Sequence, residues 1–140
     1  MTVSQAFVSS RGPEPVGPYP HARRVGNLLF ISGIGPRKRG EKGIPGVTTD
    51  AQGNVTSYDI EAQCRAVFEN IRVILEDAGC RWENIVDVTS FLTDMKRDFA
   101  AYNRVYDEYL GAVRPTRTTV EVRALPTAIN VELKVIAVVD

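Results

Sequence analysis

An arginine and a glutamate near the carboxyl-terminal end of the chain are of types that could bind a small acid and activate water. Arg117 opens the alternating part of the segment RPTRTTVEVRALP, residues 114–126, and Glu132 lies in the next alternating stretch, residues 129–137. A guanidinium group can grip a carboxylate through two parallel hydrogen bonds, and a carboxylate can accept a proton from water. Folding gives no reason for an arginine at the start of a strand, so we ask what ligand Arg117 could hold.

The alternation of polar and apolar residues in both stretches predicts two strands joined by a turn near Leu125 and Pro126. In such a hairpin Arg117 would come close in register to Glu132 and Lys134, at the open end of the two strands. An ordinary cross-strand ion pair is the alternative interpretation, and composition alone favours it, because structural ion pairs can look like sites.

Two helices are expected to support this pair. Apolar residues recur at helical spacing over residues 60–78, with Asp59 as a candidate N-cap and Gly79 as a stop. A second apolar stripe covers residues 99–110, with Asp98 as a candidate cap and Gly111 as a stop.

Strands and loops fill the rest of the chain. Strands are predicted at residues 6–9, 27–32, 85–92, 117–123 and 129–137. An irregular arm precedes the second strand, and a long glycine-rich connection, residues 33–57, follows it, with a small hairpin around Asp50 to Asn54. The order β-β-α-β-α-β-β predicts an α+β fold with two helices on one face of a sheet.

The other face of that sheet mixes polar and apolar residues and has no helix left to cover it. We therefore expect this face to be buried against other copies of the chain.

Composition limits the function classes. The length of 140 residues fits a single domain, residues 1–140, and 17 basic residues balance 17 acidic ones. Zero net charge gives no general reason to bind nucleic acid or a membrane surface, and no apolar run is long enough to span a bilayer. Cys64, Cys80 and the single histidine, His21, fit no metal-ligand spacing. These features, without a signal-peptide pattern, predict a cytoplasmic protein with free thiols.

Several motifs together resemble the RidA/YjgF family of imine and enamine deaminases along nearly the whole chain. The matching pieces are GPYP (17–20), FISG (30–33), EDAG (76–79), AAYNRVYDEYL (100–110), RPTRTTVEVRALP (114–126) and NVELKVIAV (130–138). The resemblance implies a chorismate-mutase-like α+β fold, with two helices on one face of a mixed sheet. It also implies a homotrimer with sites between its subunits and chemistry that needs no cofactor.

The same resemblance assigns roles to individual residues. Arg117 would grip the substrate carboxylate and Glu132 would hold the attacking water. The other matching positions, which would line the substrate pocket, are Tyr19, Ser32, Gly33, Asn103 and Thr119. Thr119 stands where many relatives have a cysteine, and this position is thought to act through its backbone carbonyl.

The stretch GPYPHARRVGNLLFISGIGPR, residues 17–37, is similar to a narrower group, the 2-aminomuconate deaminases of aromatic-compound degradation. Their substrate has two carboxylates, so a second cation is needed, and Arg37 in the basic run 37–39 is the candidate. The resemblance therefore implies release of ammonia from 2-aminomuconate to give the 2-oxo acid, 4-oxalocrotonate. A general deaminase of 2-imino acids and a non-catalytic trimer that binds keto acids remain alternatives. RNA cleavage, ascribed to relatives, is not expected, because the sequence has zero net charge and no aromatic and basic face.

Overall fold

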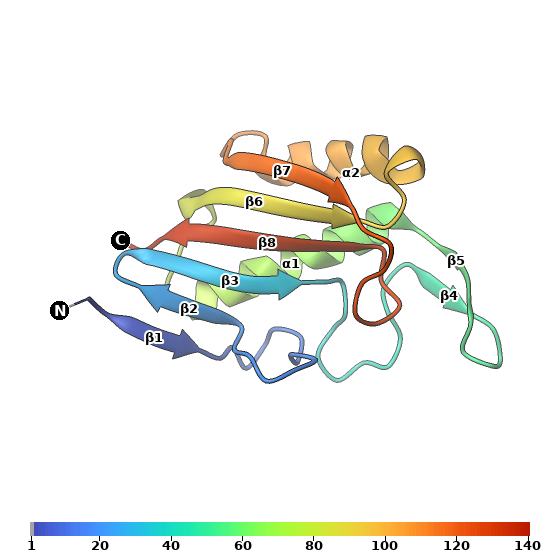
Figure 1. Cartoon of the computed structure of the whole chain (residues 1–140), viewed down its shortest axis with the longest axis horizontal. Helices are drawn as coiled ribbons and strands as arrows, with labels where there is room; N and C mark the ends of the chain where they lie inside the picture. Colours follow the sequence, from blue (N-terminus) through green and yellow to red (C-terminus); the bar gives the residue numbers. More distant parts are fainter. Residues whose placement is uncertain (1) are drawn as a thin grey trace.

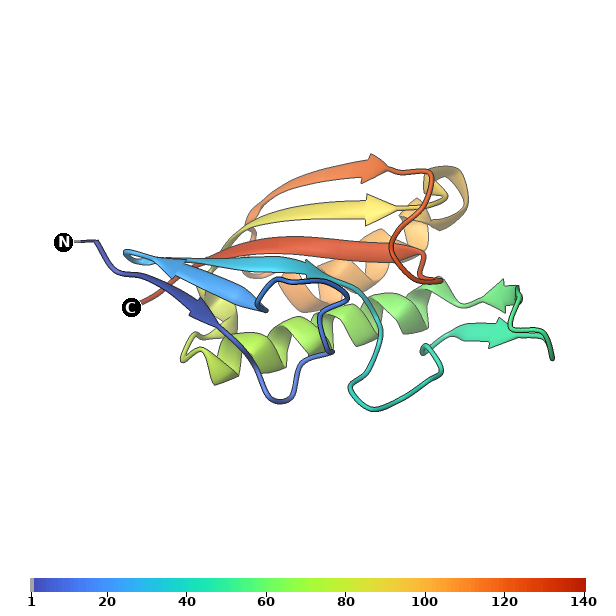
Figure 2. The same ribbon diagram turned by 60° about the horizontal axis from the view of Figure 1, so that its bottom comes forward.

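The computed structural model describes residues 2–140 as an α+β fold: a six-stranded sheet with two long helices packed on one of its faces (Figure 1, Figure 2). The elements are β1 (Ser4–Phe7), β2 (Ala22–Val25), β3 (Leu28–Ile34), β4 (Val47–Thr49), β5 (Val55–Tyr58), α1 (Ile60–Asp77), the 3-10 turn η1 (Trp82–Asn84), β6 (Ile85–Leu92), α2 (Met95–Leu110), β7 (Thr116–Glu121) and β8 (Val131–Val138). The predicted fold class is confirmed.

Helix α1 begins and ends where its sequence indicates. The Asp59 side chain accepts a hydrogen bond from the backbone N–H of Ala62, and Gly79 has a φ of 79°, which a residue with a side chain rarely adopts. The apolar stripe of α1 packs on the sheet, and residues such as Val67 and Ile74 are completely buried. This packing fixes which sheet face is covered.

The order of strands in the sheet is β1-β2-β3-β8-β6-β7, and this order corrects the predicted hairpin. Strand β7 does not pair with β8: it pairs in parallel with β6, so that β6, α2 and β7 form a crossover unit. Strand β8 lies between β3 and β6 and is antiparallel to both. Polar alternation shows that two segments are strands, but it does not show which strands are neighbours.

The cap predicted for α2 is also wrong. The helix begins at Met95, and the Asp94 side chain caps it by accepting a hydrogen bond from the Arg97 N–H at 3.0 Å. Asp98 lies inside the first turn, is 1% exposed, and accepts a hydrogen bond from the Tyr58 hydroxyl at 2.7 Å. The predicted end is confirmed, because Leu110 is the last helical residue and Gly111 is the C-cap.

The amino-terminal half contains more strand than the sequence indicated. Strand β1 lies two residues earlier than predicted, and β2 follows the irregular arm of the first twenty residues, in a segment where no strand was predicted. The hairpin expected around Asp50 exists as β4 and β5, and the Asp50 side chain accepts hydrogen bonds from the backbone N–H groups of Gln52 and Asn54. This hairpin projects beyond one end of the sheet (Figure 2).

The core lies between the sheet and the helices, and strand β8 shows how the two faces differ. Its residues alternate between buried positions such as Val131 and Leu133 and partly exposed ones such as Glu132. Within residues 2–140, no helix is both long and apolar enough to cross a membrane.

Candidate functional site

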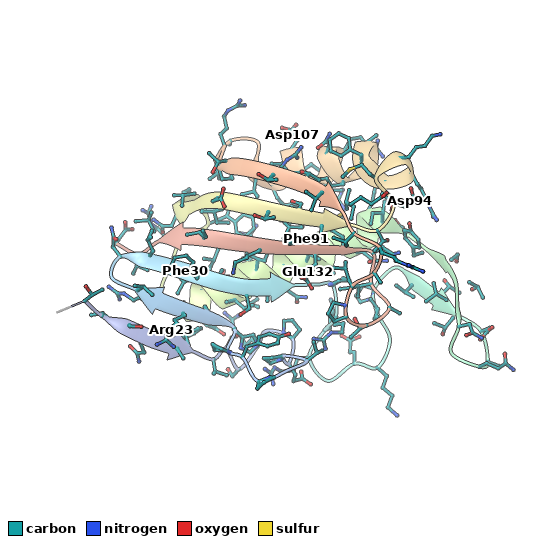
Figure 3. The ribbon with its side chains drawn as sticks, in the orientation of Figure 1. Arg23, Phe30, Phe91, Asp94, Asp107 and Glu132 are labelled. Carbon is teal, nitrogen blue, oxygen red and sulfur yellow. The ribbon has the colours of Figure 1, made fainter. Side chains whose placement is uncertain are left out.

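Glu132 lies on the uncovered face of the sheet, at the edge of a hollow of about 310 Å³ (Figure 3). This hollow, the Glu132 hollow, is also lined by Tyr19, Ser32, Gly33, Pro126 and Lys134. A Cβ atom placed on Gly33 would lie 2.5 Å from a carboxylate oxygen of Glu132. Glycine at this position therefore lets the carboxylate lie against the end of β3.

The Glu132 carboxylate is half-buried and makes no hydrogen bond or ion pair with the described residues, 2–140. Burial raises the pKa of this carboxyl group above its usual range, because the charged form loses hydration. A carboxylate with a raised pKa and no protein partner is suited to accept a proton from a bound water.

The arm between β1 and β2 brings Tyr19 to the Glu132 hollow, and His21 fastens this arm. The His21 ring is 2% exposed; its Nδ1 accepts a hydrogen bond from the backbone N–H of Ser9 and its Nε2 contacts the carbonyl of Pro13 at 2.7 Å. These contacts require neutral imidazole with its proton on Nε2. Nearby, the Ser32 hydroxyl donates to the Pro20 carbonyl at 2.8 Å.

This role of His21 is not predicted from the sequence. The one feature that could have suggested it is a single histidine next to a proline-rich arm, and this feature predicts a structural role only weakly.

The basic run 37–39 also fastens the arm. Arg37 donates a hydrogen bond to the carbonyl of Glu14 at 2.7 Å, and Arg39 donates to the carbonyls of Gly12 and Ser9. Only Lys38, between them, faces solvent without such a partner. The run is therefore not a solvated loop tip. Arg37 also borders a small hollow together with Tyr19, Ser32 and Gly33, which places it beside the predicted pocket residues.

Arg117 lies at the opposite margin of the sheet, on the face covered by α2. Its Nη1 donates to the Asn103 side-chain oxygen at 2.9 Å, and its guanidinium carbon lies 4.7 Å from the ring centre of Tyr106 and 5.3 Å from that of Tyr102. Burial raises the pKa of Tyr102 to about 12, so this ring is neutral beside the cation. The rings and Asn103 hold Arg117 ready for an anion.

Two hydroxyl groups next to Arg117 are buried without a hydrogen-bond partner among the described residues: those of Tyr106 and Thr119. Tyr106 and Arg117 both line a second hollow, of about 330 Å³, at the margin between α2 and β7. Buried hydroxyls usually find a partner, so the hydroxyl of Tyr106, which borders this hollow, is available to a further group.

The structure thus divides the predicted site into two parts. Arg117 pairs in register with Val88, a core residue, whereas Glu132 pairs with Phe91 on the uncovered face. Side chains on opposite faces of one sheet cannot reach the same small ligand. The predicted proximity of Arg117 and Glu132 within one chain is therefore wrong, because it rested on the hairpin that the structure does not contain.

Other reactive groups do not form a centre of their own. Cys64 and Cys80 are buried free thiols, and burial raises the pKa of Cys64 to about 12, which makes its thiol a poor nucleophile. Within residues 2–140, no group of three or more His, Cys, Asp or Glu side chains could hold a metal ion.

Comparisons with known proteins match almost the full chain. The family model described as endoribonuclease L-PSP matches residues 9–139. A RutC family protein of Pyrococcus abyssi is 37% identical over 133 residues, which cover 95% of each chain. A 2-iminobutanoate/2-iminopropanoate deaminase of Salmonella typhimurium is 30% identical over 139 residues, covering 97% of this chain and 98% of the relative.

Solved structures agree with these matches. The structure of E. coli TdcF with bound serine has a TM-score of 0.82 at 30% identity, covering 97% of this chain and 99% of the other. The YjgF gene product from E. coli has a TM-score of 0.81 at 30% identity, covering 96% and 98%.

Proposed function

The chain belongs to the endoribonuclease L-PSP family, which is the RidA/YjgF family that its motifs indicated, and from this premise we propose that it is a hydrolytic deaminase of 2-imino and enamine acids. The observation that carries the proposal is the Glu132 carboxylate. It is half-buried and unpaired among the described residues, its pKa is raised by burial, and it faces a hollow that can hold a small molecule and a water.

In the proposed reaction Arg117 positions the substrate and Glu132 is the only base. The enamine first becomes the imine, whose carbon is electrophilic. The oxygen of water forms a bond to that carbon while Glu132 accepts a proton, and the proton then passes to the nitrogen. The hydroxyl proton of this adduct then moves to the nitrogen as the C–N bond breaks and the C=O bond forms. Ammonia leaves and the 2-oxo acid remains, so that imine and water give ketone and ammonia. Arg117 holds the neighbouring carboxylate, which fixes the carbon beside the water.

The site is proposed to form between subunits of a homotrimer. Arg117 and Glu132 lie on opposite faces of their own sheet, and a heterologous contact can bring Arg117 of one subunit to Glu132 of the next. The exposed apolar side chains Val86, Val120 and Phe99, each 37–41% exposed at the β6, β7 and α2 margin, support burial of this region in an assembly. Asn103 and Thr119 would join the site with Arg117, and Tyr19, Ser32 and Gly33 would join it with Glu132.

Within this class, 2-aminomuconate is the proposed substrate and 4-oxalocrotonate the product, in the degradation of aromatic compounds. The sequence stretch 17–37 supports this choice, and Arg37 borders the hollow that Tyr19 and Ser32 share. None of the relatives described above is named for this substrate; the Salmonella relative is named for 2-iminobutanoate and 2-iminopropanoate. A general deaminase of short 2-imino acids is therefore the second candidate.

Ammonia release from freshly generated imines tests the proposal. The purified protein is mixed with 2-iminopropanoate and, separately, with 2-aminomuconate, and ammonia and 2-oxo acid are measured against spontaneous hydrolysis. We expect acceleration of at least one, with kcat/KM higher for 2-aminomuconate. Binding of the 2-oxo acid without any acceleration would indicate a non-catalytic binding protein, and cleavage of RNA without deamination would indicate a nuclease; either result contradicts the proposal.

A further inference from the structure

Arg117 is not the only cation in the hollow at the α2–β7 margin. Arg114 also lines this hollow, together with Asn103, Tyr106 and Asp107, and we name it the two-arginine hollow. Arg114 lies in the turn that connects α2 to β7, and Asp107 lies on the adjacent end of α2 (Figure 3). Both arginines come from the same chain, so their proximity does not depend on how subunits assemble.

The backbone of Arg114 has an unusual conformation. Its φ is 58°, in the left-handed region that residues with side chains seldom adopt, and its N–H donates to the carbonyl of Leu110 at 2.9 Å. Pro115 follows and restricts the backbone further. This conformation closes the turn after α2, and it sets the direction in which the Arg114 side chain starts.

The guanidinium of Arg114 is unoccupied by protein groups. Among the arginines of residues 2–140, only Arg114 and Arg123 make no side-chain hydrogen bond, ion pair or contact with an aromatic ring. Arg37, by contrast, donates to the Glu14 carbonyl. Arg114 is thus the one arginine that both borders a hollow and keeps all its donors for a ligand.

We propose that Arg114 and Arg117 together bind the two carboxylates of a dicarboxylate substrate, with Arg114 as the second cation in place of Arg37. This inference rests on the proposed deaminase function. Three residues of extended chain span at most about 10 Å, and flexible arginine side chains can shorten that separation to the length of a six-carbon diacid. Asp107 offsets one of the two positive charges, so the hollow keeps a net charge of about +1, which favours anions over neutral ligands.

Binding of two matched ligands tests the inference without requiring turnover. Muconate carries two carboxylates, and sorbate has the same six-carbon diene with a methyl group in place of one of them. Their dissociation constants are measured by calorimetry for the parent protein and for Arg114→Gln, Arg37→Gln and Arg123→Gln. Arg123 is the matched control, because it is equally unpartnered but does not line the hollow.

The parent protein should bind muconate at least tenfold more tightly than sorbate. Arg114→Gln should weaken muconate about tenfold, as expected for loss of one charge-assisted contact, and should leave sorbate unchanged. Arg37→Gln and Arg123→Gln should leave the ratio unchanged. Equal affinities in the parent, equal loss of both ligands in Arg114→Gln, or selective loss in Arg37→Gln alone would each overturn the inference.

The two experiments distinguish a failure of the deaminase assignment from a failure of the proposed role of Arg114. If muconate binds in the predicted pattern but no imine is hydrolysed, then the two-arginine site stands as a binding site and the deaminase assignment falls. If imines are hydrolysed but the selectivity ratio of kcat/KM for 2-aminomuconate over 2-iminopropanoate is unchanged in Arg114→Gln, then the deaminase stands and the second-cation role falls.

Discussion

Replacing Arg117 by lysine separates the shape of its side chain from its charge. Lysine keeps the positive charge but loses the planar pair of donors that matches a carboxylate. It also loses the hydrogen bond to Asn103 at 2.9 Å and the stacking on Tyr106 at 4.7 Å, which hold the arginine in place. One charge-assisted hydrogen bond contributes about 1.5–3 kcal/mol, so the change should lower kcat/KM by roughly 30-fold. Arg117→Ala, which removes both donors and the charge, should cost about 2–4 kcal/mol of transition-state stabilisation.

The assay is the initial rate of ammonia release from 2-iminopropanoate over a range of concentrations, with spontaneous hydrolysis subtracted. Thermal unfolding of each variant is the control, because Arg117 is on the margin of the sheet and its loss should leave the core intact. Asn103→Ala should give a smaller loss than Arg117→Lys, since it removes only the residue that orients the guanidinium. If Arg117→Lys and Arg117→Ala both stay within threefold of the parent, then Arg117 does not bind the substrate carboxylate.

Three further predictions concern Glu132, Gly33 and Tyr58. In Glu132→Gln, kcat should fall more than KM rises, and the acid limb of the pH profile should disappear, because the ionised base acts only above its raised pKa. Gly33→Ala should lower activity with little change in the melting temperature, since the new methyl group would push the Glu132 carboxylate aside. Tyr58→Phe should reduce the free energy of unfolding by about 1–3 kcal/mol in urea titrations, because buried Asp98 loses its hydrogen-bond donor.

Each of these has an outcome that would contradict it. A Glu132→Gln variant that changes only KM would make Glu132 a binding residue. Full activity in Gly33→Ala would show that the position of the carboxylate is not critical, and an unchanged unfolding curve for Tyr58→Phe would show that Asp98 does not depend on that hydroxyl.

The change of folding stability with pH should also depend on Glu132. Burial raises its pKa in the folded protein, so the folded state holds this proton more tightly than the unfolded state does, and the parent loses stability as pH rises through the raised pKa. The Glu132→Gln variant has no carboxyl group at this position, so it should not lose this stability as the pH rises. The melting temperature of the variant relative to the parent should therefore be higher at pH 7 than at pH 4.

The helices and the fold class could be predicted because their signals are local. The stripe and caps of α1 lie within a few residues of one another, and the Asp59 cap and Gly79 stop were both found where expected. Asp98 was mistaken for a cap because Asp94 and Asp98 are one turn apart, and sequence does not show that Asp98 faces inward to Tyr58.

The pairing of strands could not be predicted from alternation. A strand that follows a crossover helix can pair with the strand before that helix, as β7 does with β6, and this depends on packing of α2 on the sheet. The predicted hairpin therefore placed Arg117 beside Glu132, whereas Arg117 lies on the face of the sheet that α2 covers. Strand β2, with the sequence ARRV, was missed because two charged residues hide a short strand that pairs with β1 and β3.

The proposed catalysis requires a site shared between subunits, and mixed oligomers test this requirement directly. Arg117→Ala and Glu132→Gln should each be nearly inactive alone. The two variants are co-expressed with different tags, and the mixed oligomers are isolated. Some of their interfaces then contain the intact Arg117 of one subunit and the intact Glu132 of its neighbour. In a mixed trimer of either composition, about one of the three interfaces joins a subunit with intact Arg117 to a neighbour with intact Glu132, so about a third of the sites should be intact. Recovery of about a third of the parent rate is the predicted result, whereas a rate no greater than that of the two variants separately would show that the site is not shared between subunits.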